Sequence, residues 1–184
     1  AAFDVHDPDA LAAFFQSFST PIDHLLVTAG APYYAPFADM DIADASRHVA
    51  EEVRVTLETA RHAAATMRPG GTLLLMSGTG GRRPAVGIGI TALLTVGLPA
   101  LAANLALELA PVRVNVIAAG FVDTPLSASL LGAGLDERRE NLRTTLPIRR
   151  VVTPQDVAAL AVHVMVNTAL TGATFDIDGG QQLT

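Results

Sequence analysis

The sequence predicts an α/β protein with three layers, in which a doubly wound and mostly parallel sheet is covered by helices on both faces. Short apolar runs bounded by Gly and Pro alternate with longer segments of helical periodicity throughout the 184 residues. The short runs are continuously apolar, which is typical of strands buried on both faces of a parallel sheet. No internal repeat or linker interrupts the alternation, so we expect a single domain over residues 1–184.

Four segments are predicted to be buried strands, at residues 25–28, 72–76, 112–118 and 174–177. Gly30, Ser77 and Gly120 directly follow or end the first three of them. Because the carboxyl ends of parallel strands share one edge of the sheet, these residues are expected at the edge where such folds bind ligands. Gly at these points lets a ligand approach the backbone closely, although plain turn glycines are an alternative interpretation.

Two further segments have clear helical signals. Apolar residues recur every three or four positions from Val49 to Met67, and charges of alternating sign beside them predict a solvated ladder of ion pairs. The ladder comprises Arg47, Glu51, Arg54, Glu58 and Arg61. Farther on, Thr153 is a suitable N-cap, Pro154 fits the first helical position and Asp156 suits the positive end of a helix to about residue 165.

A long uncharged stretch lies between Ala85 and Leu107. Its length would allow a membrane span, but Gly, Pro, Thr and Asn residues interrupt it, and it lies between predicted strands. We therefore expect a buried helix over residues 88–109, at a sheet or subunit interface, and no membrane partner. The first residues lack the basic and apolar regions of a signal peptide, so the expected location is cytoplasmic.

Composition narrows the classes of function. The chain is 50% apolar and only 16% charged, which excludes a disordered protein. It has no cysteine, which excludes a disulfide scaffold and a zinc–thiolate site. A net charge of -6 without basic runs argues against nucleic acid as a partner. The five histidines show no metal-ligand spacing, so no metal site is expected.

The least regular region spans residues 126–150, which are apolar at first and then charged. A helical cap over a pocket and an ordinary surface excursion both fit this pattern. Four apolar residues in and before the region suggest the wall of a pocket: Phe121, Leu126, Leu130 and Leu131.

Taken together, several segments resemble the short-chain dehydrogenase/reductase family of Rossmann-fold oxidoreductases. Residues 3–5 resemble the strand end that approaches the adenine, and residues 26–30, Leu-Val-Thr-Ala-Gly, are similar to the family's Asn-Asn-Ala-Gly strand end. Residues 107–115 are similar to the stretch that joins its active-site helix to the next strand. Residues 119–125 resemble its Pro-Gly loop, with Ala119 in place of Pro, and residues 171–180 resemble its closing strand and turn. The matches cover essentially the whole chain, in order.

The resemblance implies NAD or NADP as the cofactor, a small apolar carbonyl or alcohol compound as the substrate, and a homodimer or homotetramer. The implied cofactor contacts lie at the adenine end, at one strand end and at the nicotinamide loop: Asp4, Val5, Thr28, Ala29, Gly30, Gly120, Val122 and Thr124.

The family also places a glycine-rich phosphate-binding loop between its first strand and first helix. This chain begins at what resembles the third strand, and the glycine cluster at residues 77–81 is expected to be a turn at the active-site strand. Without the family's first strand, residues 25–28 would form a strand with an unpaired edge. We therefore expect a Rossmann-like domain that is incomplete at its N-terminus, with a strand-helix-strand unit outside this chain.

The family's catalytic Tyr and Lys have no counterpart here. The Tyr position falls at Thr91 and the Lys position, four residues later, at Thr95. The family's Ser falls at Gly78 or, one residue earlier, at Ser77, and its helix Asn falls near Glu52. Ser77 and Thr91 are therefore the candidate catalytic residues of a degenerate active site.

Two functions follow from this pattern. The first is hydride transfer between NAD(P)(H) and the substrate, with a proton from water, substrate or Ser77, because a Thr hydroxyl does not ionise near neutral pH. The alternative is a catalytically inactive relative that acts as a nucleotide-binding or oligomeric scaffold. Tyr33 and Tyr34 lie after the same strand end and are expected to pack on the core instead of entering the pocket.

Overall fold

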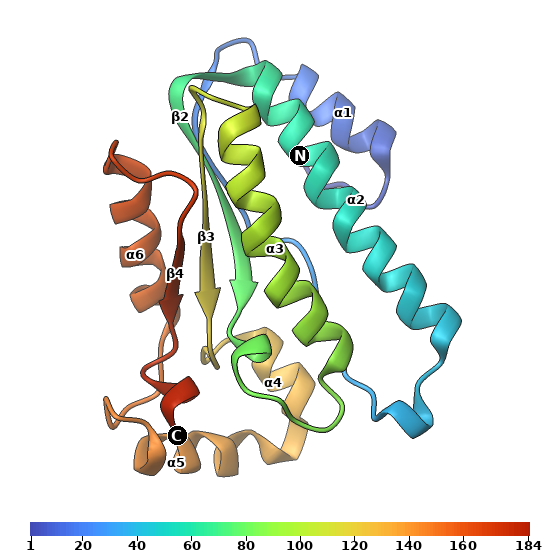
Figure 1. Cartoon of the computed structure of the whole chain (residues 1–184), viewed down its shortest axis with the longest axis vertical. Helices are drawn as coiled ribbons and strands as arrows, with labels where there is room; N and C mark the ends of the chain where they lie inside the picture. The colour runs from blue at the N-terminus through green and yellow to red at the C-terminus, as the bar shows by residue number, and fades with distance from the viewer.

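The computed structural model describes residues 1–184 and contains a four-stranded parallel sheet in the order β1-β2-β3-β4. The strands are β1 (Ile22–Val27), β2 (Met67–Gly78), β3 (Arg113–Ala119) and β4 (Thr174–Ile177). The main helices are α1 (Pro8–Gln16), α2 (Ile42–Thr66), α3 (Gly89–Glu108), α4 (Pro125–Leu131), α5 (Leu135–Thr145) and α6 (Pro154–Val166). Figure 1 shows the strands running in one direction, with all their carboxyl ends toward α4 and α5.

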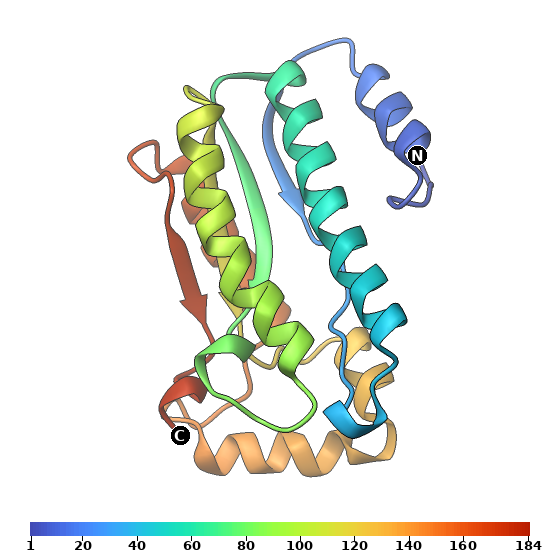
Figure 2. The ribbon, with the colours of Figure 1, turned by 45° about the vertical axis from the view of Figure 1, so that its right-hand side comes forward.

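The sheet is covered on both faces, as the sequence predicts for this fold class. Successive residues of a strand point to opposite faces, so Leu73 packs with α2 and α3, whereas Leu74 packs with α6. The larger of the two hydrophobic clusters lies on the α2 and α3 side and the smaller on the α6 side. Figure 2 shows α2 and α3 on one face of the sheet, with α1 outside α2.

All four predicted strands and the three predicted helices are present, with shifted ends. The strand expected at residues 72–76 begins earlier, at Met67, so the Pro-Gly-Gly segment before it lies within β2. A register shift between Ile22 and His24 absorbs the extra residues. The sequence reasoning did not anticipate α1, although Asp7 followed by Pro8 is a cap signal; Asp7 accepts hydrogen bonds from two backbone amides of the first turn.

The start of α6 confirms the predicted cap. Thr153 and Asp156 form a capping box, in which each side chain accepts from the other residue's backbone N–H. Arg150 pairs with Asp156 at 2.6 Å, and this ion pair together with the hydrogen bonds from Thr153 holds the pKa of Asp156 below its ordinary value.

Two expectations about exposure were wrong in part. The strand at residues 25–28 was expected to be buried, but Leu26 is 36% exposed; its place at the edge of the sheet agrees with the expected unpaired edge. The ion-pair ladder on α2 is incomplete, because Arg54 donates to the carbonyl of His6 at 2.8 Å and ties the N-terminal segment to the helix. Arg47 and Arg61 pair with carboxylates as expected.

The uncharged stretch forms α3, which is long and apolar enough to cross a membrane, with a mean hydropathy of 1.9 in its most apolar window. Only 17% of that window is buried. The buried side chains, Ala102, Leu105 and Ala106, belong to the core beneath the sheet, so α3 is a layer of the fold that has one apolar face exposed. The helix was expected at a sheet or subunit interface: its packing on the sheet is confirmed, and a subunit contact stays a prediction.

A buried arginine fastens α6 to the start of the central strands. Arg113, only 7% exposed, donates to the carbonyls of Val164, Asn167 and Leu170 at 3.0 to 3.2 Å. It also donates to the carbonyl of Met165 at 2.6 Å. The last carbonyls of a helix have no hydrogen-bond donors inside the helix, and the Arg113 guanidinium supplies those donors. Burial lowers the pKa of Arg113, whose charge is balanced by these carbonyl dipoles without a carboxylate.

We expect Arg113→Met to lower the free energy of unfolding by about 3 kcal/mol, because several buried carbonyls lose a charged donor together. Urea unfolding followed by circular dichroism measures this change. The matched control is Arg143→Met, because Arg143 is 54% exposed and pairs with Glu140 on the surface. The control should change stability by less than about 0.5 kcal/mol, and equal effects for the two variants would contradict the role assigned to Arg113.

Candidate active site

A cavity of about 1720 Å³ lies at the carboxyl ends of the strands. Its walls come from the ends of β1, β2 and β3, from α2 and α3 on one side, and from α4 and α5. This is the edge at which doubly wound sheets bind ligands. The volume exceeds the roughly 300–1,000 Å³ of an ordinary small-molecule site, so the cavity has room for a ligand larger than one drug-sized compound.

Most of the predicted site residues line this cavity. They are Ser77 and Thr91 from the catalytic set, and Thr28, Ala29, Gly30, Gly120, Val122 and Thr124 from the cofactor set. Asp4 and Val5 are not among the lining residues. The Asp4 carboxylate instead accepts from the backbone N–H of His6 at 2.9 Å, next to the turn that leads into α1. Their adenine contact stays a prediction from the resemblance.

Ser77 presents a hydroxyl without a partner. Its Oγ is buried and has no hydrogen bond within the protein, although the residue lines the cavity. A buried hydroxyl normally has a partner, because leaving it unpaired costs about 1–3 kcal/mol. The hydroxyl makes no hydrogen bond, so a change of rotamer that turns Oγ toward the cavity would break none.

Thr91 and Thr95 have hydroxyls that are already engaged. Thr91 Oγ1 donates to the carbonyl of Tyr33 at 2.8 Å and accepts from the N–H of Tyr33 at 3.0 Å. Thr95 Oγ1 donates to the carbonyl of Ala92 and accepts from the N–H of Gly81 at 3.0 Å. Thr91 thus fastens the loop after β1 to α3, and its proton points to a backbone carbonyl instead of to a ligand.

The two tyrosines of this loop separate. Tyr34 lines the cavity and is 57% exposed, contrary to the expectation that both would pack on the core. Tyr33 is outside the cavity lining and packs 5.4 Å from the ring of His48, centroid to centroid. Partial burial raises the pKa of Tyr34, so its phenol keeps its proton at neutral pH and can donate a hydrogen bond.

Glu52 supplies the only acidic side chain of the cavity lining. Its Oε1 accepts from the backbone N–H of Ala31 at 3.3 Å, and its Oε2 would lie 2.8 Å from a Cβ placed on Gly30. Gly30 also has a φ of +127°, which favours glycine. The positive φ of Gly30 and the nearby Glu52 carboxylate therefore both require glycine after β1. The hydrogen bond from Ala31 to Glu52 fixes the start of the loop.

Close packing against the C-terminal turn requires glycine at position 120. A Cβ there would lie 2.6 Å from Cβ of Asp178 and 2.8 Å from Oε1 of Gln181. Gln181 Oε1 accepts from the N–H of Phe121 at 2.8 Å, and Asp178 accepts from the N–H groups of its own turn. The C-terminal turn thus sits directly on the strand end, and close packing within the chain explains this glycine without a ligand.

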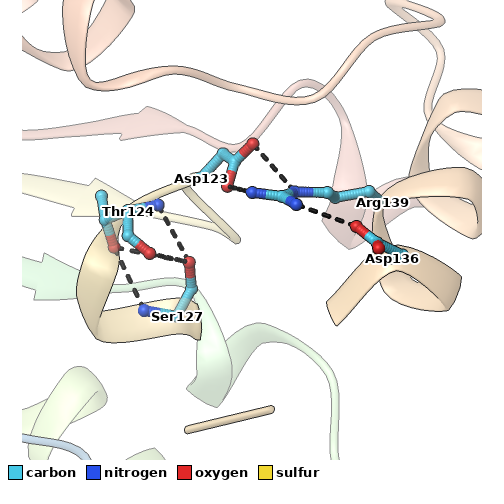
Figure 3. Close-up of polar contacts among 5 residues, drawn as sticks. All are labelled: Asp123, Thr124, Ser127, Asp136 and Arg139. Atoms are coloured by element: carbon cyan, nitrogen blue, oxygen red, sulfur yellow. Dashed lines mark hydrogen bonds and ion pairs between the residues drawn. The ribbon is translucent and has the colours of Figure 1, made fainter. Parts of the chain in front are cut away.

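A bidentate ion pair fixes the cap formed by α4 and α5. Arg139 of α5 binds both carboxylate oxygens of Asp123, at 2.7 and 3.1 Å, and also reaches Asp136 at 2.9 Å (Figure 3). Next to it, Thr124 caps α4 by accepting from the N–H of Ser127 at 3.2 Å. Asp123 follows β3, so this pair ties the cap to the end of a central strand.

The region at residues 126–150 is thus a helical cap over the cavity, which decides between the two interpretations of its sequence. The predicted apolar wall is confirmed, because all four of its residues line the cavity: Phe121, Leu126, Leu130 and Leu131. Sequence reasoning missed the ion pair of Arg139, because only the fold brings it to Asp123. It also missed two arginines of the lining, Arg83 and Arg138.

We expect Gly120→Ala to lower the free energy of unfolding by about 1–3 kcal/mol, because the added methyl overlaps the C-terminal turn. The matched control is Gly97→Ala in α3, where nothing lies within 4 Å of the added Cβ. That control should raise stability by about 0.5–1 kcal/mol, because Ala favours a helix over Gly. Urea unfolding measures both variants, and destabilisation by both would show that the space around Gly120 is not the cause.

Comparisons with known proteins agree with this architecture. Residues 1–182 match the family model described as enoyl-(acyl carrier protein) reductase. Dehydrogenase/reductase SDR family member 4 of Sus scrofa is 30% identical over 182 residues, covering 95% of this chain and 64% of the relative. The short-chain dehydrogenase/reductase UcsE of an Acremonium species is 32% identical, covering 86% of this chain and 61% of the relative. The chain thus spans about three fifths of these relatives.

Solved structures give the same result. A small-chain dehydrogenase in complex with NADPH superposes with a TM-score of 0.92 at 27% identity, covering 100% of this chain and 84% of that one. MalC reductase/Diels-Alderase of Malbranchea aurantiaca superposes with a TM-score of 0.90 at 24% identity, over 100% of this chain and 74% of the MalC chain. At that identity the match supports the fold and nothing further. The match to the family model over almost every residue is the decisive one, and the chain belongs to the short-chain dehydrogenase/reductase family of Rossmann-fold oxidoreductases.

Proposed function

We propose that the protein transfers hydride between a nicotinamide dinucleotide, NAD or NADP, and a small apolar carbonyl or alcohol compound. The observation that carries the proposal is the unpaired, buried hydroxyl of Ser77 in the wall of the strand-end cavity. The family supplies the class of reaction, and the apolar cap from α4 supplies the wall for an apolar substrate. The precedent for the cofactor is the related small-chain dehydrogenase solved with NADPH.

The residues present fit the nicotinamide end of such a cofactor. The cavity is larger than one small substrate needs, and its floor is the strand edge with Gly30, Ser77 and Gly120. Thr28, Val122 and Thr124 line the same space from the loops after β1 and β3. The glycine cluster after β2 does not form a phosphate cradle, because Gly81 packs against α3 and its N–H donates to Thr95 Oγ1.

The nicotinamide, when bound, supplies or accepts the hydride. Ser77 Oγ donates a hydrogen bond to the carbonyl oxygen, where negative charge develops during reduction, and a proton from water, from the substrate or from Ser77 completes the alcohol. Tyr34, which keeps its proton at neutral pH, supplies a second donor from the loop above the cavity. Thr91 holds that loop on α3, which makes it a positioning residue for Tyr34.

We expect NADH or NADPH to bind with an enhancement of nicotinamide fluorescence, and Ser77→Ala to leave that binding unchanged but to lower kcat/KM for a ketone about threefold to tenfold. Because the serine hydroxyl has no partner in the protein, its removal should leave stability unchanged or higher. A ketone panel followed by the loss of NADH absorbance then measures turnover. Absence of any fluorescence change with either dinucleotide would contradict the proposal.

Thr91→Val is the matched control for Ser77→Ala. It also removes one hydroxyl from the cavity lining, but this hydroxyl makes two hydrogen bonds to Tyr33. We expect it to lower the free energy of unfolding by about 1–2 kcal/mol, the opposite sign to Ser77→Ala. The two variants therefore separate a hydroxyl that serves a ligand from one that serves the fold.

We also propose that the exposed face of α3 is covered by a second copy of the chain, in a homodimer or homotetramer. Leu93, Val96 and Leu107 fall on this face and are 58%, 60% and 81% exposed. The stretch carries no charge with which a charged partner could pair. Apolar patches of this kind are normally covered, and closed homo-oligomers are the commonest way to cover them.

We expect Leu107→Glu to lower the mass measured by light scattering, because a carboxylate on each copy would be buried in the contact. Leu183→Glu is the control, because Leu183 is 80% exposed but lies near the C-terminus, away from α3. A wild-type protein that is monomeric over the whole concentration range would contradict the proposed assembly.

A further inference from the structure

Most arginines of this chain form ion pairs with carboxylates or hydrogen bonds to backbone carbonyls of the protein. All 12 basic residues are arginine. Ion pairs hold one group of them to carboxylates: Arg47, Arg61, Arg68, Arg82, Arg139, Arg143 and Arg150. Another group donates to backbone carbonyls: Arg54, Arg113 and Arg149. The two that remain are Arg83 and Arg138, and both line the strand-end cavity.

Arg138 is held at the cavity by its neighbours, without a carboxylate. Its guanidinium carbon lies 5.9 Å from the centroid of the Phe121 ring, and its only hydrogen bond is a long one of 3.5 Å to Asn141. Arg139, the next residue, ties this turn of α5 to Asp123 by two hydrogen bonds. The helix therefore presents Arg138 to the cavity from a fixed position, with its donors largely unused.

Arg83 approaches the same cavity from the loop that leads into α3. Both views show this green loop lying beside α5 (Figure 1 and Figure 2). The cap between them is apolar, with Leu126, Leu130 and Leu131 in its wall. Glu52, the one acidic side chain of the lining, is engaged elsewhere, because it accepts from the backbone N–H of Ala31 next to Gly30.

We propose that the cavity recognises an amphipathic organic anion, with Arg83 and Arg138 binding the carboxylate of a substrate whose apolar body lies against α4. The inference rests on the proposed function and refines its substrate: the apolar body is kept, and a carboxylate is added to it. An arginine fork matches a carboxylate in charge and shape, and a cavity with apolar walls strengthens the attraction. The net charge of the whole chain is -6, so two unpaired cations in one cavity are a local exception that selects for an anion.

The test compares octanoate with its neutral analogue octanamide by isothermal titration calorimetry. We expect octanoate to bind more tightly, and Arg83→Gln and Arg138→Gln each to reduce octanoate binding about fivefold without changing the binding of octanamide. Arg143→Gln is the matched control, because it removes a charge from the same helix as Arg138 but lies outside the cavity lining. It should leave the preference for octanoate intact.

Each remaining outcome overturns the proposal. Equal binding of the two compounds, no binding of either, or an unchanged preference in both cavity variants would show that these arginines do not select an anion. A phosphate group of the dinucleotide is the other source of negative charge. If NADPH displaces octanoate and both variants weaken NADPH binding, then the arginines serve the cofactor. If NADPH and octanoate bind together, the arginines serve the substrate.

Failure of this proposal is distinguishable from failure of the proposed function, since octanoate binding requires neither a nicotinamide nor hydride transfer. A protein that binds NADH and reduces neutral ketones but shows no preference for octanoate is an oxidoreductase with a neutral substrate. A protein that prefers octanoate but shows no change in nicotinamide fluorescence has the anion site without the proposed reaction.

Discussion

The parallel pairing of β2 with β3 is the constraint on which the remaining structure depends. The ladder runs without a bulge from Thr72 opposite Arg113 to Gly78 opposite Ala119. Side chains between these ends are almost completely buried, so a slip by one residue would turn the apolar set of one face toward the other. The register therefore determines both ends at once: it places Arg113 where α6 ends, and it places Ser77 at the edge that faces the cavity.

Some hydroxyls of the cavity lining are hydrogen-bonded within the protein, and one is not. The resemblance assigns the family's Tyr and Lys positions to Thr91 and Thr95, and the hydroxyls of both make hydrogen bonds to backbone groups. Ser77 Oγ makes no hydrogen bond within the protein. Thr91 and Thr95 thus hold loops to α3, and the donors that we propose for a ligand lie at the end of β2 and on the loop with Tyr34.

The sequence predicted the fold class and the presence of each strand well, because both depend on local patterns. Continuous apolar runs closed by Gly identified all four strands, and Thr153 with Asp156 identified the start of α6. Contacts between distant segments have no such local signal. Nothing next to Asp123 indicates that Arg139 will reach it, and Gly120 looks like a ligand-facing glycine until Asp178 is seen beside it. The edge position of β1 was expected from the resemblance, and the apolar surface of α3 was expected from the uncharged stretch that forms it.

Two neighbouring arginines on α5 have different roles: one anchors the helix, and the other is free to bind an anion. Arg139 is neutralised by two carboxylates, and this pairing holds the cap to the end of β3. Arg138 is next in the chain, so the same anchoring limits where its guanidinium can lie, and it faces the Phe121 ring and the cavity. A mobile arginine would lose side-chain entropy when it bound an anion, whereas a held one has already lost much of it in the fold. The ion pair at Asp123 thus prepares the neighbouring charge for a ligand, although its own charges are balanced within the protein.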